Sequence, residues 1–281
     1  MEAIFVNRTE RGKKRPLPAL FVFVVVMAVA ALASAPRAKA EDLSAYDTLG
    51  IYNELGYAVR DGEATVVGYT GDIAELHIPG ELDGHRVTGI GDGAFRDCAS
   101  LTSVTMPDSV NRIGNFAFSG CSSLRDIVIP DSVASVGAHA FSGTPWFSDL
   151  DDDFVILGGV LIKCGLAEAA SISIPGGVTS IAGGAFDGCP GVDRVTLPDS
   201  VRFIGDWAFR GCSGLQSAYF EGDAPALANH AFDDVAGNFT VYYREHTFFW
   251  SDPWHEYPAK LYEDTVSERM SSEYLISLSK K

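Results

Sequence analysis

The stretch "LTSVTMPDSVNRIGNFAFSGCSS" (Leu101–Ser123) is one copy of a phrase that recurs along the chain. Its closing part, IGNFAF, has five counterparts that end at Phe95, Phe141, Phe186, Phe209 and Phe232. Neighbouring phenylalanines are 23 residues apart, except for one step of 45 residues between Phe141 and Phe186. A fixed period of this length is typical of a solenoid, in which each repeat forms one coil and stacking buries a continuous core.

One repeat predicts one coil. Val104 and Met106 alternate with polar residues, which indicates a short strand, and Pro107 ends it because proline cannot donate to a sheet ladder. Gly114 is expected to adopt a backbone conformation that a Cβ would forbid. The last part of the repeat fills the interior, so the structural core is expected to contain Phe95, Phe118, Phe141, Phe186, Phe209 and Phe232, with Cys98, Cys121, Cys189 and Cys212.

The irregular segments are expected to cap or extend the stack. "YAVRDGEATVVGY" (Tyr57–Tyr69) predicts a capping hairpin that turns at Asp61-Gly62, and Gly158-Gly159 predicts a hairpin-like coil that keeps the stack continuous. Aromatic residues between Phe239 and Tyr262 form either a hydrophobic lid or a carbohydrate-binding platform, and the lid is favoured because a terminal coil must be covered.

The first 40 residues have the order of a signal peptide. A basic stretch precedes the apolar run Leu17–Ala35, and Ala38-Lys39-Ala40 fits a cleavage site; an uncleaved membrane anchor is the alternative. This leader carries 7 Lys and Arg and 2 Asp and Glu, so the remainder carries 14 and 35 and has a net charge of −21. Such a charge excludes nucleic acid as a plausible partner.

Four cysteines each follow a repeat phenylalanine by three residues and so occupy one structural position. Buried thiols are favoured over Cys98–Cys121 and Cys189–Cys212 disulfides, because stacked side chains that point the same way suit the disulfide torsion poorly. Cys164 is unpaired under both interpretations, and no Cys/His spacing indicates zinc.

The sequence contains no catalytic or nucleotide-binding motif. His139 and His230 share a repeat position that elsewhere holds glycine, phenylalanine or tryptophan, so this position is expected to be solvent-facing and permissive. The acidic cluster Asp149–Asp153 lacks the features of an EF-hand loop and is interpreted as a solvated loop rather than a calcium site. No metal, cofactor or enzymatic activity is expected.

The candidate site is the exposed face of the strands. Outward positions at successive coils are expected to form two continuous columns with steps of about 4.8 Å, and solenoids commonly bind partners along such a face. The alternative is that these residues are simply good strand formers. The proposed ligand-binding residues are His77, Thr105, Val128, Ser173, Thr196 and Tyr219 in one column, and Ser103, Asp126, Ser171, Arg194 and Ser217, preceded by Glu75, in the other.

The phrases "LTSVTMPDSVNRIGNFAFSGCSSL" and "VDRVTLPDSVRFIGDWAFRGCSGL" closely resemble the BspA-type (Treponema pallidum-type) leucine-rich repeat, over about residues 57–262. The resemblance implies a secreted or cell-surface protein that binds other proteins or glycans in adhesion or host-matrix interaction. The final residues, LISLSKK, carry no LPxTG-type sorting signal, so anchoring to a cell wall does not follow from the resemblance.

The sequence thus predicts a β-rich leucine-rich-repeat solenoid of right-handed coils with short strands and short helical or 3-10 turns. The expected organisation is a signal peptide at 1–40, an N-terminal segment with a capping hairpin at 41–72, repeats at 73–236 with an insert at about 146–170, an aromatic cap at 237–262 and a polar tail at 263–281. The expected product is an extracellular monomer that binds protein or glycan ligands of host matrix or other cells, without nucleic acid and without a membrane domain after cleavage. The alternative function is a structural display or spacer module without its own ligand.

Overall fold

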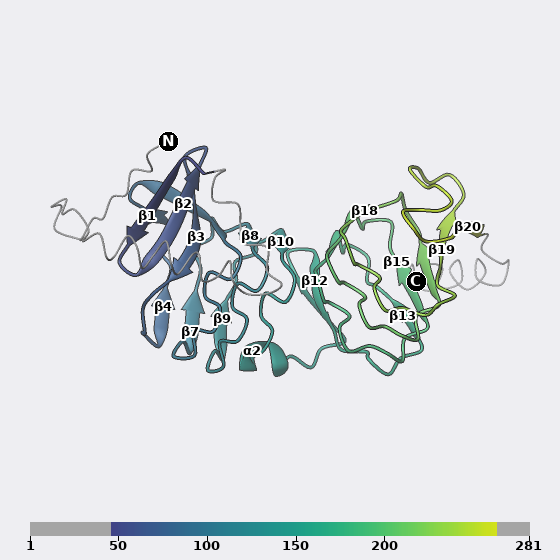
Figure 1. The fold of residues 1–281 in the computed structure, drawn as a ribbon, viewed down its shortest axis with the longest axis horizontal. Coiled ribbons are helices and arrows are strands. Elements are labelled where there is room, and N and C mark those ends of the chain that lie inside the picture. The colour runs from purple at the N-terminus through teal and green to yellow at the C-terminus, as the bar shows by residue number, and fades with distance from the viewer. Residues whose placement is uncertain (1–45, 263–281) are drawn as a thin grey trace, which may run out of the picture.

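The computed structural model describes residues 46–262, and in these residues the chain forms an elongated stack of coils with little helix (Figure 1). This confirms the predicted solenoid. The predicted signal peptide and polar tail lie outside the described residues. No helix in the described range is long and apolar enough to cross a membrane.

Each regular coil supplies two short strands, one to each side of the stack. In the coil built by the first quoted phrase, β7 (Ser103–Thr105) buries Val104, and β8 (Arg112–Ile113) buries Ile113. The sequence indicated only the first of these. The second strand is two residues long, and such a length is too short to show the alternation that identifies a strand.

The strands form four sheets, two on each side of the stack. One side carries β4 (Glu75–His77), β7 and β9 (Asp126–Val128), followed by a separate sheet of β13 (Ser171–Ser173), β15 (Arg194–Leu197), β17 (Ser217–Phe220), β19 (Thr240–Arg244) and β20 (Ala259–Tyr262). The other side carries β1 (Thr48–Tyr52), β2 (Leu55–Arg60), β3 (Glu63–Tyr69), β5 (Glu81–Leu82), β6 (His85–Ile90), β8 and β10 (Ser135–Val136), then β11 (Phe154–Leu157), β12 (Val160–Cys164), β14 (Ser180–Ile181), β16 (Phe203–Ile204) and β18 (Ala226–Leu227). Pairing between successive coils is parallel throughout.

The insert keeps the buried core continuous, since Val155, Val160 and Ile162 belong to the same cluster as the preceding coils and His139 N donates to Gly183 O at 3.3 Å, but it interrupts the sheets. The helix α2 (Pro145–Ser148) begins at Thr144, whose side chain accepts a hydrogen bond from Phe147 N at 3.1 Å. Trp146 N donates to Leu124 O at 2.9 Å, which places α2 beside β9 where the next strand would lie (Figure 1). A helix cannot continue the ladder of a sheet, and the sheet of β4, β7 and β9 therefore ends there.

The second part of the insert is the predicted hairpin. β11 and β12 pair antiparallel and turn at Gly158 and Gly159, whose φ values of 52° and 83° suit a two-residue turn. β12 then pairs parallel with β14, so the hairpin starts the second sheet on its side of the stack.

The repeat phenylalanines are fully buried, and they form two stacked columns, one on each side of the insert. Rings stack at centroid distances of 5.0 Å for Phe95–Phe118 and 5.8 Å for Phe118–Phe141, and again at 4.4 Å for Phe186–Phe209 and 4.9 Å for Phe209–Phe232. Between the two columns, Trp146 and Phe147 pack on Phe141. The core thus consists of two clusters that meet at the insert.

The backbone conformation that was expected at Gly114 occurs at a different position of the repeat. A positive φ occurs two residues later in each coil, at Gly93, Phe116, His139, Gly184, Trp207 and His230. Aromatic side chains there stack along the molecule, with centroids 5.4 Å apart for Phe116–His139, 6.0 Å for His139–Trp207 and 6.4 Å for Trp207–His230. The left-handed conformation costs about 1–2 kcal/mol per residue, and stacking offsets about 0.5–1.5 kcal/mol of it per pair. The backbone of this position is therefore constrained, while its side chain varies between coils and is partly exposed at Phe116, His139 and Trp207 and exposed at His230.

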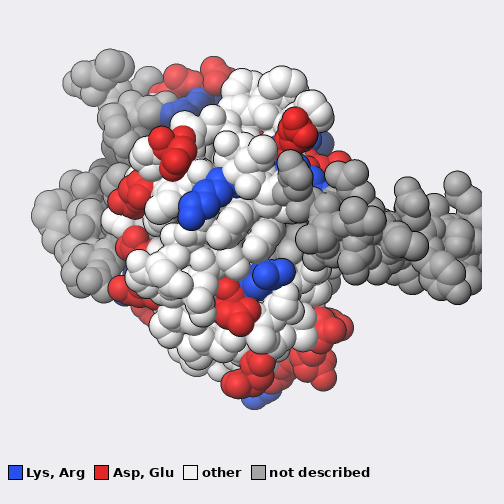
Figure 2. Space-filling view, turned by 90° about the vertical axis from the view of Figure 1, so that its right-hand side faces the viewer, with Lys and Arg blue, Asp and Glu red and all other residues white. Residues whose placement is uncertain are grey.

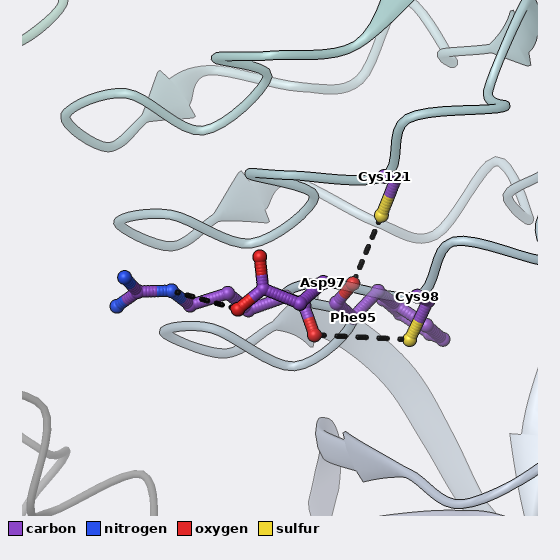
Figure 3. Close-up of polar contacts among 5 residues, drawn as sticks. Phe95, Asp97, Cys98 and Cys121 are labelled. Carbon is purple, nitrogen blue, oxygen red and sulfur yellow. Dashed lines mark hydrogen bonds and ion pairs between the residues drawn. The ribbon is translucent and has the colours of Figure 1, made fainter.

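All five cysteines are free thiols in the structure, and they form two groups along the stack. Figure 3 shows Cys98 and Cys121 on neighbouring coils, with Cys121 Sγ donating to Phe95 O at 2.9 Å. Cys98 is only half-buried, contrary to expectation, because the coil before it is replaced by the cap. Cys164 has no disulfide partner, as expected, and β12 places its thiol beside Cys189 in the second group.

Cys98 is expected to be the first cysteine that iodoacetamide alkylates in the native protein. Interaction with the neighbouring thiol of Cys121 lowers the pKa of Cys98, and the partial exposure of Cys98 admits the reagent. Burial raises the pKa of Cys212 to about 12, and Cys121, Cys164 and Cys189 are buried. Peptide mass spectrometry after brief labelling at about pH 8 measures the order, and the other four should react only in denaturant. Labelling that requires a reductant would instead show disulfides.

Both ends of the stack are covered. The predicted hairpin of β2 and β3 turns at Asp61 and Gly62 and pairs with β6, while β1 adds a strand that the sequence did not reveal. At the other end, Trp250 and Trp254 pack on Phe220, and Tyr257 packs on Phe232. Trp254 is only 4% exposed, which is consistent with the favoured lid, whereas Phe248 and Phe249 in the same segment are exposed and do not cover the core.

Candidate functional site: the strand face

The predicted site residues lie on the outward side of β4, β7, β9, β13, β15 and β17. Between them, the inward residues Leu76, Val104, Ile127, Ile172, Val195 and Ala218 are buried. The outward residues are half-exposed or exposed, as the alternation of a strand requires. Their exposure shows that they lie on the surface. Their role as ligand-binding residues remains a proposal.

The two expected columns are not continuous. Val128 on β9 and Ser173 on β13 belong to different sheets, separated by α2 and the hairpin of β11 and β12. We call the outward side of β4, β7 and β9 the N-terminal half-face, and that of β13, β15, β17, β19 and β20 the C-terminal half-face. Only within one half-face do outward residues follow one another in register.

The C-terminal half-face extends further than the sequence indicated. Thr196, Tyr219, Tyr242 and Lys260 follow one another in register across four strands, and Arg244 pairs with Tyr262 across the last two. Tyr242 and Tyr262 had been assigned to the terminal lid. The alternation of inward and outward residues in Thr240–Arg244 was the sequence signal for this strand. It was missed because aromatic residues on both sides made the whole segment resemble a lid.

The C-terminal half-face carries a cluster of tyrosine and arginine side chains. The rings of Tyr219 and Tyr242 stack with centroids 4.7 Å apart, and Tyr262 meets Tyr219 edge-on at 5.0 Å. The guanidinium carbon of Arg194 lies 4.7 Å from the centroid of Tyr219. Arg244 donates from Nε to Tyr262 Oη at 3.0 Å and pairs with Glu221 at 3.2 Å. These contacts hold five large side chains in a defined arrangement on an exposed sheet.

The two half-faces differ in charge. Outward residues of the N-terminal half-face include the acidic Glu75 and Asp126 and no lysine or arginine. Outward residues of the C-terminal half-face include Arg194, Arg244 and Lys260 and no carboxylate. Figure 2, a view of the C-terminal end, shows acidic residues mostly around the margin of a largely uncharged surface.

Other candidate sites are weaker. The described residues contain no group of three potential metal ligands, and Asp149, Asp151, Asp152 and Asp153 are all exposed. A pocket of about 140 Å³ lies at the insert, beside His139, Ser142 and Lys163. Burial lowers the pKa of His139, and its Nδ1 lies 3.4 Å from Ser142 Oγ. Ligand sites usually have about 300–1,000 Å³, so this pocket is too small for a substrate of ordinary size.

The fold and this face define a leucine-rich-repeat solenoid of the kind that presents an exposed parallel sheet. The model of the "BspA type Leucine rich repeat region" family matches residues 84–151 and 164–245 in six copies. The chain therefore belongs to the BspA-type leucine-rich-repeat family. The family is one of surface-type repeat proteins, which is consistent with a protein-binding role.

Solved structures similar to this chain are also leucine-rich-repeat proteins. A Treponema pallidum leucine-rich-repeat protein is 26% identical, with 69% of this chain and 85% of that chain covered and a TM-score of 0.38. A Bacteroides ovatus leucine-rich-repeat protein is 20% identical, with 77% of each chain covered and a TM-score of 0.34. A leucine-rich cell-surface protein of Faecalibacterium prausnitzii is 19% identical, with coverage of 81% and 98% and a TM-score of 0.29. No curated protein matches the chain.

Proposed function

We propose that this chain is an exported, non-enzymatic repeat protein that binds an extracellular protein through the C-terminal half-face. The observation that carries the proposal is the cluster of Tyr219, Tyr242, Tyr262, Arg194 and Arg244 on one exposed sheet. Tyrosine and arginine are enriched at protein interfaces and among the residues that contribute most to binding.

The arrangement of the cluster supports binding rather than a purely structural role. Ring and guanidinium contacts within it restrict the side chains before a partner arrives, which lowers the entropy lost on association. The inward residues of the same strands already supply the core, so the outward rings are not needed to bury it. The leader and the family support an extracellular setting, where adhesion to host matrix or to other cells is the role we favour.

Tyr219→Ala is expected to weaken binding at least about tenfold, as truncation of a central interface tyrosine commonly does. The readout is surface plasmon resonance of the exported protein against host-matrix proteins and bacterial cell-surface proteins. Thr105→Lys, on the N-terminal half-face, is the matched control and should leave affinity within about twofold, because rim and non-interface changes cost little. Thr105→Lys should unfold within about 0.5 kcal/mol of the parent. Tyr219→Ala also loses its ring contact with Tyr242, so its free energy of unfolding should fall by about 0.5–1.5 kcal/mol, and the variant should remain folded under the binding conditions.

The opposite pattern of results would relocate the site. If Thr105→Lys removes binding and Tyr219→Ala does not, the N-terminal half-face is the interface. If the protein binds no partner from either panel, a display or spacer role is the better account of the solenoid.

A further inference from the structure

The basic side chains of the C-terminal half-face stand out against the charge of the chain. The protein has 37 acidic and 21 basic residues, yet the outward positions of this sheet hold three basic residues and no acidic one. With 37 acidic and 21 basic residues, most of three randomly placed charged residues would be acidic. A local reversal of charge attracts anionic groups and orients their approach.

Arg194 is placed to receive a carboxylate. Its guanidinium carbon lies over the ring of Tyr219, 4.7 Å from the centroid, and a guanidinium held over one aromatic face keeps N–H groups that can donate to a partner. A stacked guanidinium is weakly hydrated, and it can donate two parallel hydrogen bonds to one carboxylate. Arg194 forms no ion pair with any described residue, so this capacity is not used within the part of the chain that the structure describes.

Lys260 and Arg244 complete the basic surface from the other side of the tyrosines. Lys260 is exposed and lies in register with Tyr242, and Arg244 is oriented by Tyr262 and Glu221. Arg194 and Lys260 are three strand spacings apart, or about 15 Å with the offset along the strands, and an extended peptide covers that distance in four to five residues.

We propose that the C-terminal half-face binds an acidic segment of a protein partner, with carboxylates at Arg194 and Lys260 and apolar or aromatic contacts on the tyrosines between them. This rests on the proposed function and names the partner's chemistry. The N-terminal half-face, with Glu75 and Asp126 at outward positions, repels the same segment and confines it to one half of the molecule.

A protein segment fits this surface better than a sulfated polysaccharide. Three basic residues, one of them already paired with Glu221, supply little of the dense positive charge that a polyanion requires. The larger part of the surface is tyrosine, threonine and serine, a composition that suits polypeptide side chains and backbone.

The test is selection of peptides from a random display library on the exported protein, followed by affinity measurements on the selected peptides. We expect them to be enriched in Asp and Glu. The Arg194→Glu/Lys260→Glu variant should bind them more than tenfold more weakly. The control Arg86→Glu makes one of the two charge reversals on β6, on the other side of the stack, and should stay within twofold, whereas Arg194→Glu alone should already weaken binding beyond that. Raising salt from ~0.05 M to ~0.5 M should weaken binding several-fold, since screening acts on exposed charges.

Each contrary result has a distinct meaning. The selected peptides could be neutral, fail to bind Tyr219→Ala and still bind the charge-reversed variant. That result would contradict the proposal of an acidic partner but would support the C-terminal half-face as the binding face. Peptides indifferent to both changes, or a failure to select any peptide, overturn the inference and the proposed face together. A third outcome is that acidic peptides bind neither protein, and that a sulfated polysaccharide binds the parent but not the charge-reversed variant. That result would show that the basic surface binds a glycan.

Discussion

Phe209→Ala is expected to lower the free energy of unfolding by about 3–5 kcal/mol, the usual cost of truncating a fully buried phenylalanine. Phe209 has no exposed surface and stacks between Phe186 at 4.4 Å and Phe232 at 4.9 Å. Removal of its ring therefore leaves a cavity that opens toward two coils at once. A rigid stack of backbone ladders on both sides limits the collapse that could fill it.

Urea unfolding followed by far-UV circular dichroism measures this loss as a lower midpoint. Phe203→Ala is the matched control in the same coil, because Phe203 points outward on β16 and is 44% exposed. That variant should differ from the parent by about 0.5 kcal/mol at most. Equal losses for both variants would contradict the buried column as the main source of stability in the second half of the stack.

Gly137→Ala is expected to destabilise the protein by about 1–3 kcal/mol through overpacking. The φ of Gly137 is not in the left-handed region, so backbone conformation does not require glycine. A Cβ at this residue would lie 2.6 Å from Gly114 C and 2.8 Å from Asn115 Cα in the preceding coil. Both are backbone atoms, so relief requires the two coils to move apart and to lengthen hydrogen bonds such as Gly137 N to Ile113 O, which is 2.8 Å.

Gly176→Ala is the control, because a Cβ there meets no atom within 4 Å and the residue has no positive φ. Its thermal midpoint should equal or slightly exceed that of the parent, since alanine restricts the unfolded chain. A midpoint for Gly137→Ala as high as that of Gly176→Ala would show that the spacing of the coils is not the constraint. Alanine already occupies the corresponding position at Ala182, after the hairpin of β11 and β12, and at Ala228 in the last repeat, where Ala228 N still donates to Ile204 O at 2.9 Å. The expected cost therefore applies to the close approach of Gly137 to Gly114 and Asn115.

The sequence by itself determined the repeat, the buried phenylalanines, the outward positions of the strands and the hairpins at Asp61-Gly62 and Gly158-Gly159. These features depend on local alternation and on a period of 23 residues, both of which are visible within one or two coils. The family followed from the same pattern.

The division of the strand face was decided only by the tertiary structure. The insert contains apolar runs of the right type for a coil, but whether it adds a strand or a helix beside β9 depends on how Trp146 and Phe147 pack on Phe141. Likewise, Tyr242 and Tyr262 resemble lid residues in sequence, and they reach the strand face because β19 and β20 pair in register with β17. Contacts between distant segments set both outcomes, and such contacts have no local signature. The sequence could therefore place each outward residue on its own coil, whereas only the stacking of coils brought Arg194, Tyr219, Tyr242, Arg244 and Lys260 onto one surface.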